Sequence, residues 1–375
     1  MRKIKILEAV GTLGVGGNEL FVMNFYRHID KSKFQIDFIT FSDNLYFKDE
    51  IEKSGSKVYV SPLIKRNNKW IKLFHDMRFI YFILKKNNYD IIHCHSCSFV
   101  GLFRGVLPAL LIKDIKIITH SHNTGKATGN ILDKILRFLL KILLSNIIDI
   151  GMACSDLAGK SKYTKAFIHS NKYKLINNAI ETEKYLFNKN YRNEVRKQLG
   201  INENVIVIGN VGRLAMQKNQ TFLINILFNL IKQKKNVYLL IAGGGILEKT
   251  LEDKVVKLGL NEFVYFAGET DDVYKYYSAM DVFVMPSLYE GLPFTAIEAQ
   301  VNGLKCVFAD TITKMADISG NNIYISLNSP ISNWSNLVLE QGLSRNSLDS
   351  VKKVCMKYNI ANESKRLEKI YSSCV

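Results

Sequence analysis

The chain has 375 residues, of which 47% are hydrophobic and 23% charged, a composition that excludes a disordered chain and is typical of a globular protein. This length exceeds one ordinary hydrophobic core, so we expect two domains. Six cysteines at irregular positions exclude a disulfide framework and favour a reducing cytoplasm, and no apolar run reaches the roughly 18 uncharged residues of a membrane-spanning helix.

The formal net charge of +17 is unevenly distributed. Residues 1–180 hold 28 lysines and arginines against 14 aspartates and glutamates, whereas residues 181–375 hold 23 against 20. In the first half, Leu63–Lys86 interleaves basic and aromatic residues, and helical spacing would place the aromatic side chains on one face with cations at its edge. That pattern favours an anionic membrane surface as a partner, with an ordinary core-facing helix as the alternative. No recognisable nucleic-acid module is present, so nucleic acid is not an expected partner.

Strands and helices alternate along the chain in two series. The first series comprises strands at Ile4–Val10, Phe34–Thr40, Val58–Val60, Asp90–His93, Lys116–Thr119 and Ile148–Ala153, with a helix at Leu20–His28. The second comprises strands at Val205–Val211, Val237–Ala242, Val264–Ala267, Val282–Met285 and Lys305–Ala309, with helices at Gln220–Lys232, Ile246–Leu258, Val273–Ala279 and 293–302. Such alternation predicts parallel sheets. We therefore expect an α/β protein of two Rossmann-like, doubly wound domains, with a cleft at the carboxyl ends of their strands.

The first series opens with a glycine turn, Gly14–Glu19, which follows a strand and precedes a helix. A dinucleotide-binding fold must be considered, because Asp37 lies about twenty residues further on. The fingerprint fails, however, since Glu19 occupies its third glycine position and Asp37 falls in mid-strand. Gly16 and Gly17 instead indicate a place where the backbone approaches a ligand closely.

The second series has a basic loop, Gly212–Asn219, after its first strand. Arg213 can bind two phosphate oxygens through its planar guanidinium, and Lys218 can add a point charge, so this loop is suited to a diphosphate. The triplet Gly243–Gly245 after the next strand is a weak signal alone.

The segment Val284–Asn302 places Glu290 on a loop and Glu298 inside a helix, with Pro293 expected at an early helical position. Eight residues of helix would separate the carboxylates by about 12 Å, which is too far for the pair that flanks a bond in a glycosidase. They could instead hold different parts of one hydroxyl-rich ligand, whose phosphates lie over the helix N-terminus between them.

Two histidine segments belong to the first series. His93–Cys97, with the sequence H-C-H-S-C, offers metal ligands or a redox pair, but a second ligand pair at matching spacing is missing and no metal is expected. His120 and His122 follow the strand Lys116–Thr119.

Four segments, in this order and spacing, resemble the family 4 glycosyltransferases of GT-B fold, closest to the bacterial capsule and exopolysaccharide branch. They are G-R-L-x-x-Q-K-N from Gly212, A-G-G-G from Ala242, F-A-G-x-x-x-D-V from Phe266, and P-S-x-x-E-G-L-P-x-x-x-x-E-A from Pro286. The resemblance covers nearly the whole chain, including the G-G-x-E segment at Gly16 and I-I-H-x-H-S at Ile91.

The resemblance implies that the chain is divided into two domains and a C-terminal helix. Residues 1–178 would form an acceptor-binding domain, residues 179–355 a nucleotide-sugar-binding domain, and residues 356–375 a helix that crosses back to the first domain. It also implies a retaining, metal-independent transferase that moves a hexosyl or N-acetylhexosaminyl group without a cofactor. The donor would be a nucleotide-sugar, expected to be a UDP-sugar.

By matching positions, the resemblance gives each site residue a role. Arg213 and Lys218 would neutralise the donor diphosphate, Glu298 would hold the ribose and Glu290 the sugar hydroxyls near the reacting carbon. Further donor-binding residues would be Gly16, Gly17, Gly243, Gly244, Gly268, Gly291, Leu292, Pro293 and Phe294. His122 and Glu290 would be the catalytic residues. His122 matches the family's histidine near the donor sugar, although His120 stays an alternative, and His95, His120 and Asn123 would lie on the acceptor side.

The expected function is therefore sugar transfer to a lipid-linked or membrane-proximal glycan acceptor, at the inner face of the plasma membrane. Two other classes of protein stay open as alternatives. One is an NAD(P)-dependent oxidoreductase built on Gly14–Gly17, and the other is a noncatalytic scaffold or partner subunit on the same fold.

Overall fold

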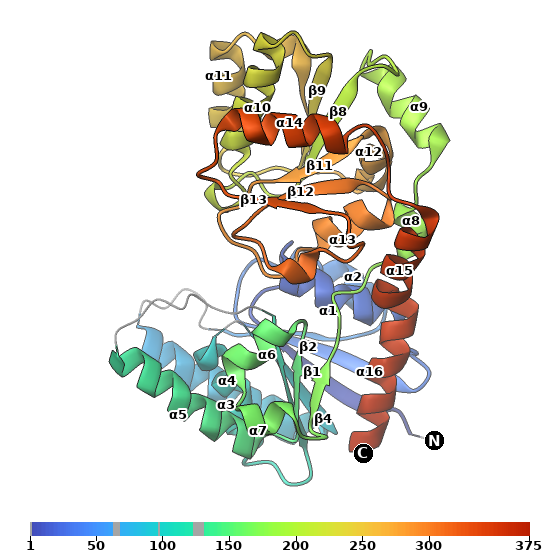
Figure 1. Ribbon diagram of the computed structural model, residues 1–375. Helices are drawn as coiled ribbons and strands as arrows, with labels where there is room; N and C mark the ends of the chain where they lie inside the picture. The colour runs from blue at the N-terminus through green and yellow to red at the C-terminus, as the bar shows by residue number, and fades with distance from the viewer. Residues whose placement is uncertain (1, 63–67, 97, 123–130) are drawn as a thin grey trace. The chain divides into compact units, whose positions relative to one another are not determined.

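A computed structural model describes residues 2–62, 68–96, 98–122 and 131–375 of the chain. The chain forms two compact units, Met1–Ala179 together with Ile360–Val375, and Ile180–Asn359 (Figure 1). The last sixteen residues thus belong to the N-terminal unit. Asn123 lies outside the described residues, as does the start of Leu63–Lys86.

The N-terminal unit contains a seven-stranded parallel sheet of order β3-β2-β1-β4-β5-β6-β7. Its strands are β1 (Ile4–Val10), β2 (Phe34–Thr40), β3 (Val58–Val60), β4 (Ile91–His95), β5 (Lys116–Ser121), β6 (Ile150–Ala153) and β7 (Tyr173–Leu175). Its helices are α1 (Gly17–His28), α2 (Lys48–Lys53), α3 (Lys69–Asn87), α4 (Phe99–Ala109), α5 (Ile131–Ile147), α6 (Asp156–Lys162), α7 (Lys165–Ile168) and α16 (Ile360–Cys374).

The C-terminal unit contains a six-stranded parallel sheet of order β10-β9-β8-β11-β12-β13. Its strands are β8 (Ile206–Val211), β9 (Val237–Ala242), β10 (Val264–Phe266), β11 (Val282–Met285), β12 (Lys305–Ala309) and β13 (Ile323–Ile325). Its α-helices are α8 (Thr182–Tyr185), α9 (Lys189–Gln198), α10 (Gln220–Lys232), α11 (Glu248–Lys257), α12 (Val273–Ala279), α13 (Phe294–Val301), α14 (Ile331–Gln341) and α15 (Leu348–Tyr358), and its 3₁₀ turns are η1 (Met216–Lys218), η2 (Asn261–Phe263) and η3 (Lys314–Ala316).

Helices cover both faces of the N-terminal sheet. On one face, alternate strand residues such as Leu7 and Ile92 pack against Ile80 of α3, Leu102 of α4 and Leu144 of α5. The opposite face carries Glu8 and the strand histidines, and it is lined by side chains of α1 and α16. Because side chains alternate along a strand, the apolar core and the polar cluster lie on opposite sides of the same strands.

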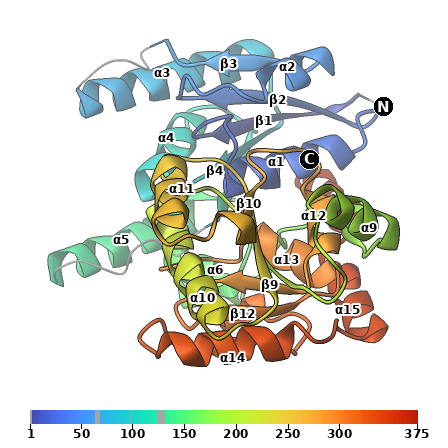
Figure 2. The same cartoon turned by 90° about the horizontal axis from the view of Figure 1, so that it is seen from above.

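The C-terminal unit has its own core, in which α10, α11 and α14 pack on one face of the sheet. Leu223 and Leu227 of α10 meet Val255 of α11 and Trp334 of α14, all of them buried, over the sheet residues. Figure 2 shows α10 and α14 beside each other in this layer. The two predicted parallel-sheet domains are therefore confirmed.

The structure differs from the sequence prediction at a few element ends. β7 and β13 were missed. Each has only three residues, all partly buried, and in β7 a lysine interrupts the apolar residues. Pro293 was expected inside α13 but is its N-cap, with φ −75° and ψ 137°, so the helix begins at Phe294.

Candidate functional site

In the C-terminal unit, the loops that follow β8, β9 and β10 are joined backbone to backbone. Leu214 donates to the Gly244 carbonyl at 2.8 Å, and Gly243 donates to the Gly268 carbonyl at 2.8 Å. Gly243 has a φ of +126°, and a Cβ there would lie 2.3 Å from the Gly212 carbonyl oxygen. Only glycine fits this position, so the triplet fixes the loop that carries Arg213 and Lys218.

Lys218 and Glu290 form an ion pair between the loop after β8 and the loop after β11. Lys218 Nζ lies 2.8 Å from Glu290 Oε1, with side chains 16% and 9% exposed. Two further bonds join the same loops, since Leu288 donates to the Gln217 carbonyl at 2.8 Å and Gln217 Nε2 donates to the Tyr289 carbonyl at 3.0 Å. The pair is thus held in place by its own loops.

Glu298 lies inside α13 and is buried. Its Oε2 accepts a hydrogen bond of 2.7 Å from the Tyr277 hydroxyl of α12. Burial raises the pKa of Glu298, although hydrogen bonds from Tyr277 and Tyr185 oppose that rise. The carboxylate therefore keeps hydrogen-bonding capacity in a poorly solvated place, which suits it to accept hydroxyl groups of a ligand.

Most of the predicted C-terminal residues lie at the carboxyl edge of this one sheet. Arg213 is exposed on the loop after β8, while Gly291, Leu292, Pro293 and Phe294 lead from Glu290 into α13. Tyr185 and Tyr277, which contact Glu298, were not predicted. No sequence signal distinguishes them from core aromatic residues.

In the N-terminal unit, four histidines gather where β4 and β5 end. The two strands pair in parallel with His95 opposite His120, so His93 and His95 lie beside His120 and His122. The ring centroids of His95 and His122 are 5.1 Å apart, and those of His120 and His122 are 4.4 Å apart. Phe21 of α1 packs edge-on against His120 and His122.

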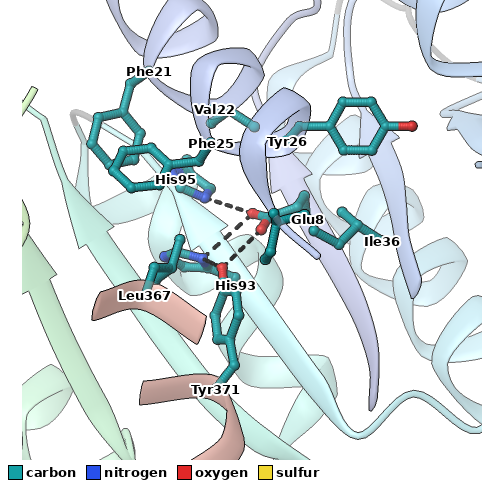
Figure 3. A pocket seen from close by; sticks show the side chains of 11 residues that line it. Glu8, Phe21, Val22, Phe25, Tyr26, Ile36, His93, His95, Leu367 and Tyr371 are labelled. Atoms are coloured by element: carbon teal, nitrogen blue, oxygen red, sulfur yellow. Dashed lines mark hydrogen bonds and ion pairs between the residues drawn. The ribbon is translucent and has the colours of Figure 1, made fainter. Parts of the chain in front are cut away.

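Glu8 of β1, opposite His93 in register, organises this cluster. His95 Nε2 lies 2.6 Å from Glu8 Oε2, and the Tyr371 hydroxyl of α16 donates to Glu8 Oε1 at 3.0 Å (Figure 3). His93 Nδ1 lies 2.7 Å from the same hydroxyl. These residues line a small cavity of about 10 Å³, close to the volume that one water molecule needs.

Burial sets the protonation of the cluster. It lowers the pKa of His95 to about 4 and holds the pKa values of His120 and His122 well below the usual range. Burial alone would raise the pKa of Glu8, but interactions with His93 and His95 outweigh it and lower that pKa. At neutral pH, Glu8 is therefore a carboxylate and His95, His120 and His122 are neutral imidazoles.

The remaining predicted residues of this unit occupy separate places. Gly16 is the N-cap of α1 and Gly17 its first residue, and among the described residues no atom lies within 4 Å of a Cβ built on Gly17. Asp37 is buried and accepts hydrogen bonds from the Lys57 amide and the Tyr89 hydroxyl, so it has a structural role within the unit. The contacts predicted between the donor and Gly16, Gly17 or His122 stay predictions.

Family comparisons identify the class of protein. Residues 15–184 match the family described as Glycosyltransferase Family 4, and residues 191–332 match Glycosyl transferases group 1. The solved structure of HepE from Anabaena in complex with UDP is similar over 99% of this chain and 100% of its own, with a TM-score of 0.77 and 20% identity. The fold is thus GT-B, with two Rossmann-like domains.

Curated relatives place the chain more narrowly. It is 31% identical to the putative glycosyltransferase EpsF of Bacillus subtilis, over 89% of this chain and 86% of the relative. It is 24% identical to an Escherichia coli UDP-Gal:α-D-GlcNAc-diphosphoundecaprenol α-1,3-galactosyltransferase, over 86% and 82% of the two chains. It is 25% identical to the capsular polysaccharide biosynthesis glycosyltransferase CapH of Staphylococcus aureus, over 79% and 78%.

The chain belongs to the family 4 glycosyltransferases, in their exopolysaccharide and capsule branch. Its activity is glycosyl transfer. Among the described residues, no helix has the length and apolar character needed to cross a membrane.

Proposed function

We propose that the enzyme transfers a sugar from a UDP-sugar to a lipid-linked glycan acceptor, with retention of anomeric configuration and without a catalytic metal. The observation that carries this proposal is the Lys218–Glu290 pair, which joins two loops at the carboxyl edge of the C-terminal sheet. In the free enzyme the two charges neutralise each other. A bound diphosphate would share Lys218 and free Glu290 to accept hydroxyl groups of the sugar.

The other residues at the carboxyl edge of the C-terminal sheet would contact other parts of the donor. Arg213 and Lys218 would neutralise the diphosphate, Gly243, Gly244 and Gly268 would line the base, and Glu298 would accept the ribose hydroxyls. The backbone N–H groups at the start of α13 would cap the phosphates. The positive charges that a metal ion would otherwise supply come from side chains and the helix N-terminus.

UDP as the nucleotide is supported by the UDP complex of the similar fold and by the donor in the name of the E. coli relative. In the proposed reaction the acceptor hydroxyl attacks the face from which UDP departs, and a donor phosphate oxygen takes its proton. Glu290, paired with Lys218, acts as a hydroxyl clamp in this scheme and forms no covalent bond to the sugar.

A lipid-linked acceptor is supported by the exposed surface of α5. Its outward face carries a stripe of exposed apolar side chains, and Lys134, Arg137 and Lys141 of the same helix lie outside that stripe. The members of the stripe are Ile131, Leu132, Ile135, Leu136, Phe138, Leu139, Ile142 and Leu143. This combination suits an anionic lipid surface, which would bring the enzyme to its acceptor.

The experiment that tests the site compares Lys218→Met, Glu290→Gln and the double variant. Each single change leaves one charge of a largely buried pair without its partner, so we expect losses of both activity and stability, with the stability loss on the order of 3 kcal/mol or less. The double variant removes both charges and should recover stability while transfer stays at least 100-fold reduced. Full transfer by the double variant would disprove the site.

Transfer is measured with UDP-sugars and a lipid diphosphate-linked acceptor, after a screen of UDP-, GDP- and ADP-sugars by thermal stabilisation. A ligand at 100 times its dissociation constant stabilises by about 2.7 kcal/mol. The anomeric configuration of the product, read from proton NMR couplings, tests retention. Inversion would refute the retaining mechanism and leave the donor site intact.

A further inference from the structure

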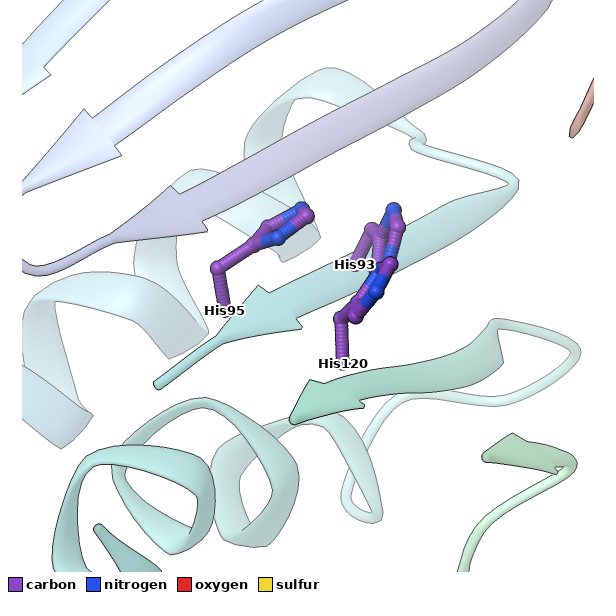
Figure 4. A group of neighbouring side chains, drawn as sticks. All are labelled: His93, His95 and His120. Atoms are coloured by element: carbon purple, nitrogen blue, oxygen red, sulfur yellow. The ribbon is translucent and has the colours of Figure 1, made fainter. Parts of the chain in front are cut away.

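Two neighbouring strands of the N-terminal sheet bring three buried histidines together. The sequence predicts no metal, because the segment of His93 and His95 lacks a second ligand pair at matching spacing. Parallel pairing of β4 with β5 supplies the missing residue, since it places His120 opposite His95 (Figure 4). One nitrogen from each of His93, His95 and His120 lies within 4.8 Å of the other two.

Hydrogen bonds around Glu8 determine which nitrogens carry protons. The Tyr371 hydroxyl donates its one proton to Glu8, so it accepts from His93 Nδ1–H, and the Nε2 of His93 keeps its lone pair. Glu8 also accepts from His95 Nε2–H, which leaves the lone pair on His95 Nδ1. A carboxylate that fixes the tautomer through the outer ring nitrogen is the usual support of a metal-binding histidine.

Three buried ring nitrogens of the cluster lack partners among the described residues. They are His93 Nε2 and both ring nitrogens of His120. Leaving buried polar atoms unsatisfied costs about 1 to 3 kcal/mol each. A bound ion would satisfy His93 and one nitrogen of His120 at once, whereas His95 Nδ1 would exchange its 2.8 Å hydrogen bond with His122 for a metal bond.

We propose that His93, His95 and His120 bind one divalent transition-metal ion, with Zn²⁺ as the best match. Three imidazole ligands suit zinc and its neighbours, whereas Mg²⁺ and Ca²⁺ require oxygen ligands. Tetrahedral Zn–N bonds of about 2.1 Å place the nitrogens about 3.4 Å apart. The rings of His93 and His95 already lie 4.0 Å apart between centroids and are tilted by only 20° and 24° from His120, so the rings must turn rather than approach one another to share one ion. The ion would join β4 to β5 and, through Glu8 and Tyr371, to β1 and α16.

This ion would be structural and lies in the other unit from the diphosphate loops. Because His95 and His120 are also predicted acceptor-side residues, zinc binding is tested without transfer activity as the readout. The test uses zinc content and zinc affinity, and slow hydrogen exchange in β4 and β5 reports that the N-terminal unit of each variant is folded.

The experiment starts from the tag-free, full-length enzyme, stripped with a chelator and dialysed first against Zn²⁺ and then against metal-free buffer. Elemental analysis should find about one zinc per chain. Co²⁺ in place of Zn²⁺ should give the visible absorption of a four-coordinate site. Retention of no zinc by the wild-type enzyme would overturn the proposal.

The variants are His120→Leu, which fills the same buried space without a ligand, and the control His169→Asn, an exposed histidine outside the cluster. We expect zinc to be lost from the first and kept by the second. Equal zinc in both would refute the site. If His120→Leu fails to fold, Glu8→Gln decides the question: zinc affinity should fall roughly 10- to 100-fold, and an unchanged dissociation constant, measured against a chromophoric chelator, would reject the proposal.

Discussion

Glu298 lowers the stability of the folded protein and is also predicted to bind the donor. Burial raises its pKa, so the folded state binds a proton at this site more tightly than the unfolded state does. The free energy of unfolding therefore falls as pH rises through the raised pKa, and this loss of stability is absent below the ordinary pKa of 4.5. Tyr277 and Tyr185, whose pKa values are raised by burial, stay protonated donors throughout this range.

The variant Glu298→Gln should therefore be at least as stable as the wild type at neutral pH while binding UDP more weakly. A lost charge-assisted hydrogen bond is worth about 1.5 to 3 kcal/mol, which corresponds to roughly 10- to 100-fold in affinity. Calorimetric titration of UDP from pH 5 to 8 tests this. The affinity difference between the two proteins should shrink toward low pH, and comparing them cancels the titration of UDP itself. A difference independent of pH would contradict the role of the carboxylate.

Other residues of the site show what a sequence can reveal. The spacing of Arg213, Lys218 and Glu290 identified groups that the structure places on neighbouring loops, with Lys218 and Glu290 in direct contact. The histidine cluster was not foreseen, because strand register decides that His95 faces His120. Glu8 and Tyr371 were missed for the same reason, since they are 363 positions apart in the chain.

At the scale of elements, long apolar runs predicted their structures well. β2, β9, β11 and β12 have the predicted bounds, because each is a buried strand between clear turn residues. Amphipathic helices are harder to interpret, since the same pattern suits a core-facing helix and a membrane-surface helix. α3 buries Ile80 and Leu84 yet exposes Trp70 and Phe74, whereas α5 exposes most of its apolar residues.

The exposed face of α5 leads to a prediction about lipid. Replacing Leu132, Leu136 and Leu139 by serine should leave the fold intact, because all three are at least 55% exposed. Each leucine contributes about 1.5 kcal/mol or more when it leaves water, so binding to anionic vesicles should fall at least 10-fold. Cosedimentation across a salt series measures it. Serine at Leu343, Leu348 and Met356, which are at least 73% exposed in the C-terminal unit, is the control and should bind like the wild type. Equal losses in both variants would reject α5 as the membrane surface.

At the scale of the whole molecule, the chain completes its first unit with its last helix. The order of strands and helices was sufficient to predict two doubly wound domains, because alternation is a property of the whole sequence. The contribution of α16 was implied only by the family resemblance. In the structure, Tyr371 and Leu367 of this helix line the sheet face that carries Glu8, and Asp30 after α1 donates its amide to Glu368 of α16 at 2.8 Å.

A chain ending at Asn359 should therefore lose the first unit selectively. It exposes Glu8 and His93, whose hydroxyl partner is gone, and uncovers the apolar side chains of α1 that pack there. Hydrogen exchange should become fast in β1 and β4, while UDP still protects residues 212–218 and 288–298, because the C-terminal unit has its own core. Native protection of β1 and β4 in the shortened chain would contradict this prediction, since the first unit would then fold without α16.

The single substitution Tyr371→Phe is milder and should lower the free energy of unfolding by about 1 to 3 kcal/mol, because it leaves buried polar groups unsatisfied.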